Sequence, residues 1–103
     1  MPRLDLQSNY LDQIKTILRE NASGLEVWAY GSRINGKSHD SSDLDLVIRN
    51  PGDLLKPTHA ISQLKQSFRD SQLPFLVDIM DWASLSENYR KEIMKQNVII
   101  WPQ

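Results

Sequence analysis

Two aspartates stand at the start of a segment that otherwise has the pattern of a buried strand. Asp43 and Asp45 flank Leu44 in the run DLDLVI, and residues two apart on a strand project from the same face. Neighbouring carboxylates repel each other, and partial burial makes their ionisation costly unless a cation neutralises them. Mg²⁺ is often held by one or two carboxylates together with substrate phosphates. The pair therefore predicts a metal site, although an exposed strand end is the commoner explanation for an isolated Asp-x-Asp.

A Gly-Ser turn upstream favours the metal site. Gly31 directly follows a predicted strand, and its missing Cβ lets a phosphate approach the backbone closely. If a helical turn begins at Ser32, its free N–H groups form a site for an anion. Arg33 and Lys37 either supply positive charge nearby or are solvated surface residues. Together with the downstream carboxylates, this turn predicts a phosphate-binding loop that faces a metal site.

A third carboxylate would complete such a site, and the run FLVDIMDW offers two. Asp78 lies in the middle of this predicted strand, where a lone carboxylate is costly without a partner. Asp81 lies at the end of the strand, and alternation directs it to the opposite face. We therefore expect Asp78 to be the third ligand and Asp81 to face solvent or shape the next turn. The alternative for Asp78 is a hydrogen bond to the local backbone.

The spacing of apolar residues and turn residues predicts an alternating series of helices and strands. In chain order, these are a helix over 8–21, strands over 25–30 and 43–48, and a helix over about 53–71 that is best defined after Pro57. They are followed by a strand over 75–82, a helix after a capping box at Ser84–Glu87, and a short strand over 97–101. The polar segment 32–42 predicts a short helical turn followed by a loop. This order predicts an α/β fold in which helices pack against a sheet.

Composition limits the class of protein. The chain has 103 residues, a net charge of −1, and 12 Lys and Arg that are scattered along it. This length predicts one domain over residues 1–103, and the scattered basic residues do not predict strong nucleic-acid binding by the protein itself. Cysteine is absent, which excludes disulfides and a cysteine nucleophile. The sequence has neither a signal-peptide pattern nor a run of about 20 apolar residues, so we expect a cytoplasmic protein without a membrane segment.

The motifs together resemble a known signature. Gly31-Ser32-Arg33, Gly36 and Ser42-Asp43-Leu44-Asp45-Leu46 are similar to the G-S-x-x-x-G…S-D-x-D-[LIV] pattern of the DNA polymerase β-type nucleotidyltransferase superfamily. The later runs VDIMDW, LSENYRKEI and NVIIW resemble its small members, the minimal nucleotidyltransferases. The resemblance spans roughly residues 8–101. One departure is Asn35, which stands where relatives usually carry a second basic residue; Lys37 is a possible substitute.

The resemblance implies a fold, a site and a reaction. The fold is the polymerase β-type nucleotidyltransferase fold, a mixed β-sheet flanked by helices. The reaction transfers a nucleoside monophosphate from a nucleoside triphosphate to a hydroxyl, with two Mg²⁺ ions and, in this case, ATP as substrate. The residues that the resemblance assigns are Asp43, Asp45 and Asp78 as catalytic metal ligands and Gly31, Ser32, Arg33 and Ser42 as nucleotide-binding residues.

The resemblance also implies a partner. Minimal nucleotidyltransferases are commonly paired with a small helical toxin of the HEPN class, and some add AMP to a tyrosine of that toxin. The leading interpretation is therefore an antitoxin that acts as a protein adenylyltransferase. Two alternatives remain: a non-catalytic antitoxin that neutralises its partner by contact, and a transferase that modifies a small molecule such as an antibiotic. A homo-oligomer is also possible.

Overall fold

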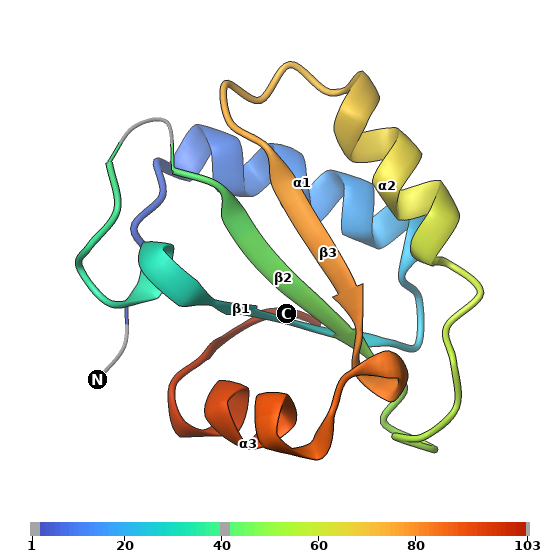
Figure 1. The fold of residues 1–103 in the computed structure, drawn as a ribbon. Helices are drawn as coiled ribbons and strands as arrows, with labels where there is room; N and C mark the ends of the chain where they lie inside the picture. The colour runs from blue at the N-terminus through green and yellow to red at the C-terminus, as the bar shows by residue number, and fades with distance from the viewer. Residues whose placement is uncertain (1–2, 40–41, 103) are drawn as a thin grey trace.

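The protein folds around a four-stranded mixed sheet with the strand order β3-β2-β1-β4 (Figure 1). The computed structural model describes residues 3–39 and 42–102. Strand β1 pairs antiparallel with both β2 and β4, whereas β2 and β3 run parallel. The strands are β1 (Glu26–Tyr30), β2 (Leu44–Arg49), β3 (Val77–Asp81) and β4 (Val98–Trp101). The expected mixed sheet flanked by helices is confirmed.

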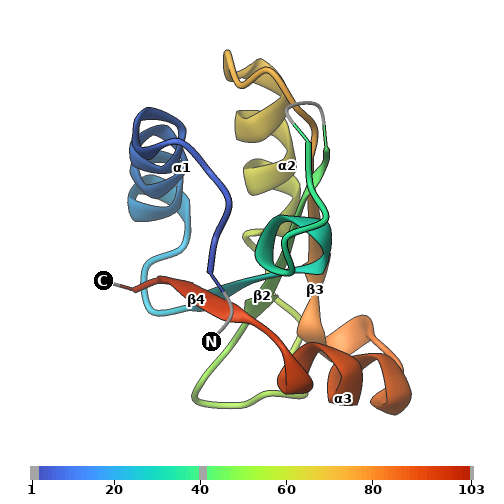
Figure 2. The ribbon, with the colours of Figure 1, turned by 90° about the vertical axis from the view of Figure 1, so that its left-hand side faces the viewer.

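Helices cover both faces of the sheet. Helices α1 (Ser8–Asn21) and α2 (Ile61–Asp70) lie side by side on one face, and α3 (Glu87–Lys95) lies on the other (Figure 2). The buried residues of α1, Ile14 and Leu18, are four apart, as expected for an amphipathic helix. In the described part of the chain, no helix is long and apolar enough to cross a membrane.

The alternation along β2 separates the core from the candidate site. Leu44, Leu46 and Ile48 are completely buried in the hydrophobic core. Asp45 projects from the opposite face, because neighbouring residues of a strand point to opposite sides. This second face is the one that α3 covers, since Tyr30, the cross-strand partner of Asp45, contacts Tyr89 of α3.

Further along the same face, an arginine lies between two indole rings. The Arg49 guanidinium carbon is 3.9 Å from the ring centroid of Trp28 and 4.4 Å from that of Trp82. Its Nη1 also lies 3.3 Å from a carboxylate oxygen of Glu26, the cross-strand partner of Arg49. Cation–π contacts of desolvated arginine contribute about 2 kcal/mol or more. This cluster fills one end of the sheet face that α3 covers. Asp45 and the candidate site lie at the other end of the same face.

The predicted helix over 53–71 is largely wrong in its first half. Only residues 61–70 form α2, and the preceding segment forms turns. The Asn50 side chain accepts a hydrogen bond from the Gly52 N–H, and the Asp53 side chain accepts one from the Leu55 N–H. Such local bonds compete with helix formation, and Leu55 remains 70% exposed because no core lies beneath it.

The predicted capping box at Ser84–Glu87 is also wrong by two residues. The N-cap of α3 is Ser86, whose side chain accepts a hydrogen bond from the Tyr89 N–H. Ser84 instead donates its hydroxyl to the Asp81 carbonyl. The other predicted elements are confirmed, with strand ends that differ by one or two residues. Part of the predicted loop over 32–42, residues 40 and 41, lies outside the described residues.

Candidate functional site

Two of the three predicted carboxylates lie opposite each other on neighbouring strands. In the parallel β2–β3 pair, Asp45 is in register with Asp78. Neighbouring strands are about 4.8 Å apart, and residues in register share a face. The expectation that Asp78 projects on the same side as Asp45 is therefore confirmed. Asp43 lies just before β2 and is exposed, two residues from Asp45 along the chain.

Within residues 3–39 and 42–102, no basic side chain pairs with the carboxylates of Asp45 and Asp78. Burial raises the pKa of Asp45, and the carboxylates of Asp78 and Asp43 raise it further. Among the described residues, none donates a hydrogen bond or forms an ion pair with the carboxylate of Asp45 or Asp78. Grouped carboxylates that lack a protein cation are arranged as expected for an external cation.

Gly31 is packed directly against Asp45. Its φ is +82°, in the left-handed region, and a Cβ at this position would collide with Oδ2 of Asp45. Only glycine satisfies both conditions without strain. Gly31 also begins a 3-10 turn, η1 (Gly31–Ile34), which confirms the predicted short helical turn. The next residue, Ser32, is partly exposed. The backbone of the predicted phosphate-binding loop therefore lies against the central carboxylate.

Arg33 and Ser42 connect the two ends of this loop. The Arg33 guanidinium donates to the Ser42 carbonyl from Nε at 3.1 Å and from Nη2 at 3.0 Å, and Nη1 donates to the Asp5 carbonyl at 3.0 Å. The guanidinium carbon also lies 4.4 Å from the ring centroid of Phe75, and the residue is only 6% exposed. The structure thus gives Arg33 a positioning role. That it and Ser42 contact nucleotide stays a prediction.

Replacing Arg33 with Ala tests this positioning role. We expect the free energy of unfolding to fall by about 2–4 kcal/mol, because buried carbonyl groups lose charge-assisted hydrogen bonds. Arg69→Ala is the control, since Arg69 is exposed on α2 and bonds only a neighbouring exposed side chain. Urea unfolding of both variants measures the difference. Equal, small losses in the two variants would contradict the role of Arg33.

Two tyrosines that no sequence motif marked, Tyr30 and Tyr89, lie beside the carboxylates. The rings of Tyr30 and Tyr89 are perpendicular, with centroids 6.1 Å apart. Burial, the neighbouring Tyr89 and the nearby charges of Asp45 and Asp78 all raise the pKa of Tyr30, so its hydroxyl stays protonated. The position of Tyr30 immediately before Gly31 was a usable signal. Tyr89 offered none, because α3 is distant in sequence.

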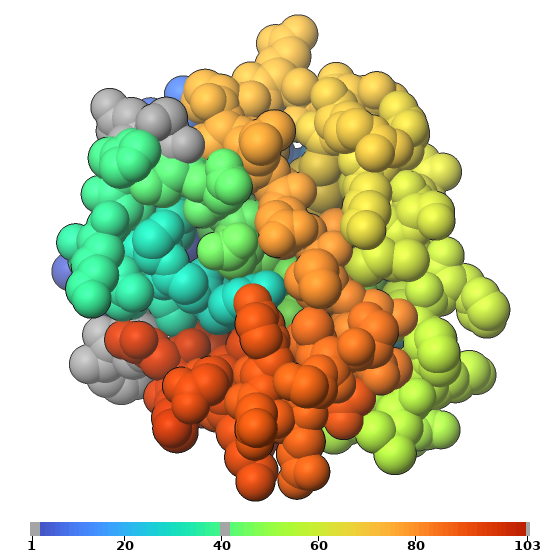
Figure 3. Space-filling view, viewed as in Figure 1, coloured from blue at the N-terminus to red at the C-terminus, as the bar shows by residue number. Residues whose placement is uncertain are grey.

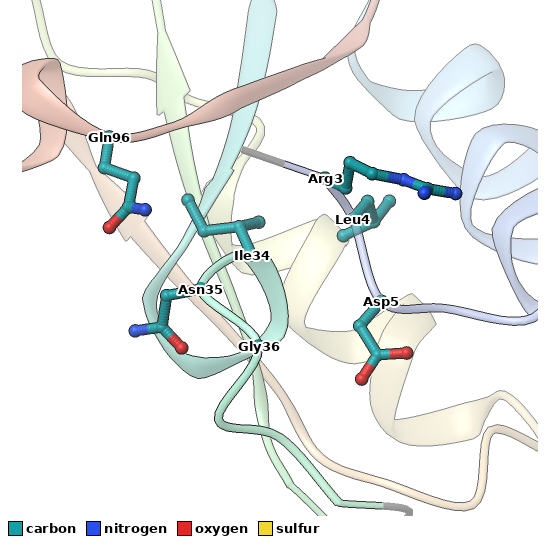
Figure 4. Close-up of a pocket in the computed structure, with 7 residues that line it drawn as sticks. All are labelled: Arg3, Leu4, Asp5, Ile34, Asn35, Gly36 and Gln96. Atoms are coloured by element: carbon teal, nitrogen blue, oxygen red, sulfur yellow. The ribbon is translucent and has the colours of Figure 1, made fainter. Parts of the chain in front are cut away.

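Among the described residues, three hollows border the η1 turn, and Arg33 lines one of them, of about 490 Å³. The other two lie toward α3 and toward the N-terminal segment. One, of about 270 Å³, lies between η1 and α3 and is lined by Tyr30, Gly31 and Tyr89 among others. The second, of about 510 Å³, lies on the N-terminal side of the turn and includes none of the three candidate carboxylates; its lining residues are Arg3, Leu4, Asp5, Ile34, Asn35, Gly36 and Gln96 (Figure 4). In the space-filling view, η1, β2 and β3 meet at the surface above α3 (Figure 3). Asn35 and Gln96 line both of these last two hollows, and only the one toward α3 also includes Gly31, which packs against Asp45.

The residues fit a metal that arrives together with phosphates. In the described ranges, no group of three acidic or histidine side chains is close enough together to hold a metal ion unaided. Mg²⁺ does not need such a group, because it keeps several waters and takes one or two carboxylates plus substrate phosphates. The Asp45–Asp78 pair offers the two carboxylates, and the Gly31 turn, which lies against Asp45, is the predicted binding site for the phosphates. The roles of Asp43, Asp45 and Asp78 as metal ligands stay predictions.

Comparisons with known proteins agree with this geometry. The sequence profile of the family "Polymerase beta, Nucleotidyltransferase" matches residues 12–103. The chain is 44% identical over 100 residues to a Haemophilus influenzae protein named probable protein adenylyltransferase MntA, and the match covers 95% of this chain and 84% of that protein.

Two solved structures have the same fold. A crystal structure of a toxin-antitoxin with AMP-PNP matches with a TM-score of 0.70 at 25% identity, over 90% of this chain and 73% of that chain. The crystal structure of the toxin-antitoxin MntA-HepT matches with a TM-score of 0.65 at 22% identity, over 94% of this chain and 74% of that chain. The profile, the relative and the first structure support one conclusion: this protein belongs to the polymerase beta nucleotidyltransferase family.

Proposed function

We propose that the protein is an Mg²⁺-dependent adenylyltransferase that transfers AMP from ATP to a tyrosine hydroxyl of a HEPN-type toxin and so acts as an antitoxin. The observation that carries the proposal is the register of Asp45 with Asp78 beneath Gly31. It is supported by the 44% identical relative, which is named a probable protein adenylyltransferase. It is also supported by the structural match to a toxin-antitoxin with AMP-PNP.

The reaction forms one bond and breaks one bond. The phenolic oxygen bonds to the α-phosphorus, the bond from that phosphorus to the bridging oxygen breaks, and pyrophosphate leaves with the electron pair. Gly31 and Ser32 hold the phosphates through their backbone, and Asp78, which is exposed, takes up the proton of the attacking hydroxyl. Asp43, Asp45 and Asp78, together with the substrate phosphates, would hold Mg²⁺, which would supply positive charge to neutralise the phosphates. Positioning and charge therefore supply most of the catalysis.

Labelled ATP tests the proposed function. We expect ATP labelled at the α-phosphate, with Mg²⁺ and the helical partner, to label the partner, and we expect ATP labelled at the γ-phosphate to leave it unlabelled. Mass spectrometry of the labelled partner identifies the acceptor residue. A folded and bound partner that acquires no α-label would contradict transfer to protein, and a γ-label would indicate phosphorylation instead.

Neutralisation by contact alone is the second candidate. Three apolar or aromatic side chains of α3 and β4 are exposed and available to a partner: Tyr89 is 47%, Met94 60% and Ile99 50% exposed. Changing both Asp43 and Asp45 to Asn separates the two functions. If the complex persists and the toxin stays neutralised, contact is sufficient; if toxicity returns in an intact complex, transfer is required.

A further inference from the structure

A shallow hollow of about 380 Å³ opens beside Asp43, and both polar and apolar atoms line it. We name it the acceptor pocket; its lining residues are Asp43, Leu73, Pro74, Phe75 and Leu76. Four of the five are apolar, and the single polar residue is a candidate catalytic carboxylate. A volume of this size is in the range of small-ligand sites, about 300–1,000 Å³. The pocket therefore combines apolar side chains with one acidic end.

The Leu76 side chain is exposed to solvent near Asp43. Its side chain is 72% exposed, although its backbone is fixed by a 2.9 Å hydrogen bond from the Leu44 N–H to the Leu76 carbonyl. Leu76 immediately precedes β3, two residues before Asp78, and it lines the same hollow as Asp43. Strand β3 is at the edge of the sheet, which leaves this side open to an approaching segment of another protein.

We propose that the acceptor pocket binds the aromatic ring of the acceptor tyrosine and directs its hydroxyl to Asp43 and Asp78. This inference rests on the proposed function. A tyrosine side chain has an apolar body and a polar tip, and the pocket presents apolar side chains beside a carboxylate. Serine and sugar acceptors have no aromatic ring to bury against the apolar side chains of this pocket. The pocket thus selects a phenol over an aliphatic hydroxyl and places its oxygen for the bond to the α-phosphorus, with the proton passing to Asp78.

The test replaces Leu76 with Ala. Because this side chain is exposed, we expect the fold to be retained, which thermal unfolding checks. Burying less apolar area against the ring lowers kcat/KM for the partner by about tenfold, while KM for ATP stays unchanged. Leu55→Ala is the matched control, since Leu55 is 70% exposed but lies beyond the opposite end of β2. We expect this variant to transfer AMP like the unaltered protein.

A second acceptor makes the test specific for the ring. The partner is also prepared with its labelled tyrosine changed to serine, and its slower modification should be insensitive to Leu76→Ala. Unchanged transfer to tyrosine, or equal losses with the tyrosine and serine acceptors, would overturn the acceptor pocket and leave the proposed function standing. Equal losses in Leu76→Ala and Leu55→Ala would overturn it as well. If the unaltered protein labels no partner, the proposed function fails, and this inference fails with it.

Discussion

Asp45→Asn is expected to lower AMP transfer on the order of a thousandfold, because a metal ligand contributes several kcal/mol of charge stabilisation in the transition state. Stability should stay the same or rise. Asp45 is partly buried beside two other carboxylates that raise its pKa, so removing its charge relieves repulsion. Transfer is measured with α-labelled ATP, and thermal unfolding is measured in the presence of a chelator.

The control for this variant is Asp12→Asn. Asp12 is exposed on α1, on the face of the sheet away from the carboxylate pair, so its replacement should change neither activity nor stability. A large fall in the melting temperature of Asp45→Asn without metal would show that this carboxylate supports the fold. Full activity in the variant would remove Asp45 from the site.

Gly31→Ala should damage stability and activity together. A left-handed backbone costs a residue with a Cβ roughly 1–2 kcal/mol, and here the new Cβ would also collide with the Asp45 carboxylate. We therefore expect a loss of free energy of unfolding of about 3 kcal/mol or more and a fall in transfer of about a hundredfold, because Asp45 must move. Urea unfolding and the labelling assay measure the two effects.

Gly24→Ala separates strain from collision. Gly24 has a φ of +78°, close to that of Gly31, but nothing lies within 4 Å of a Cβ built there. The free energy of unfolding of this variant should fall only by the cost of the left-handed backbone, and its transfer activity should not change. In an Asp45→Ala background, Gly31→Ala should then cost no more stability than Gly24→Ala, since the colliding group is gone. Equal costs of Gly31→Ala with and without Asp45 would contradict the contact.

The sequence predicted the elements better than their mutual placement. Helix α1 was predictable, because apolar residues at helical spacing have a core to cover. The first half of the predicted 53–71 helix failed because Asp53 and Asn50 form local turns that apolar spacing does not record. The position of the N-cap was ambiguous, because Ser84 and Ser86 both precede Glu87 and both could cap a helix. Ser84 donates its hydroxyl to the Asp81 carbonyl, which leaves Ser86 to accept the capping hydrogen bond from the Tyr89 N–H.

Strand alternation predicted which carboxylates could share a face, but the sequence did not predict the register that places Asp45 opposite Asp78. Alternation placed Asp43 with Asp45, yet nothing local in sequence determines that Asp45 pairs with Asp78. Parallel register depends on how the connecting segment and α2 pack, which are long-range effects. The positioning role of Arg33 was also not predictable, because its hydrogen-bond partner Asp5 is distant in sequence.

The central claim is that Asp45 and Asp78 together bind a divalent ion beside a triphosphate on the Gly31 turn. The most direct measurement is anomalous scattering from Mn²⁺ in crystals grown with a non-hydrolysable ATP analogue. We expect an anomalous peak at bonding distance, about 2.0–2.2 Å, from oxygens of both carboxylates and from a phosphate oxygen. An ion that binds the analogue elsewhere, with Asp45 and Asp78 both unligated, would contradict it.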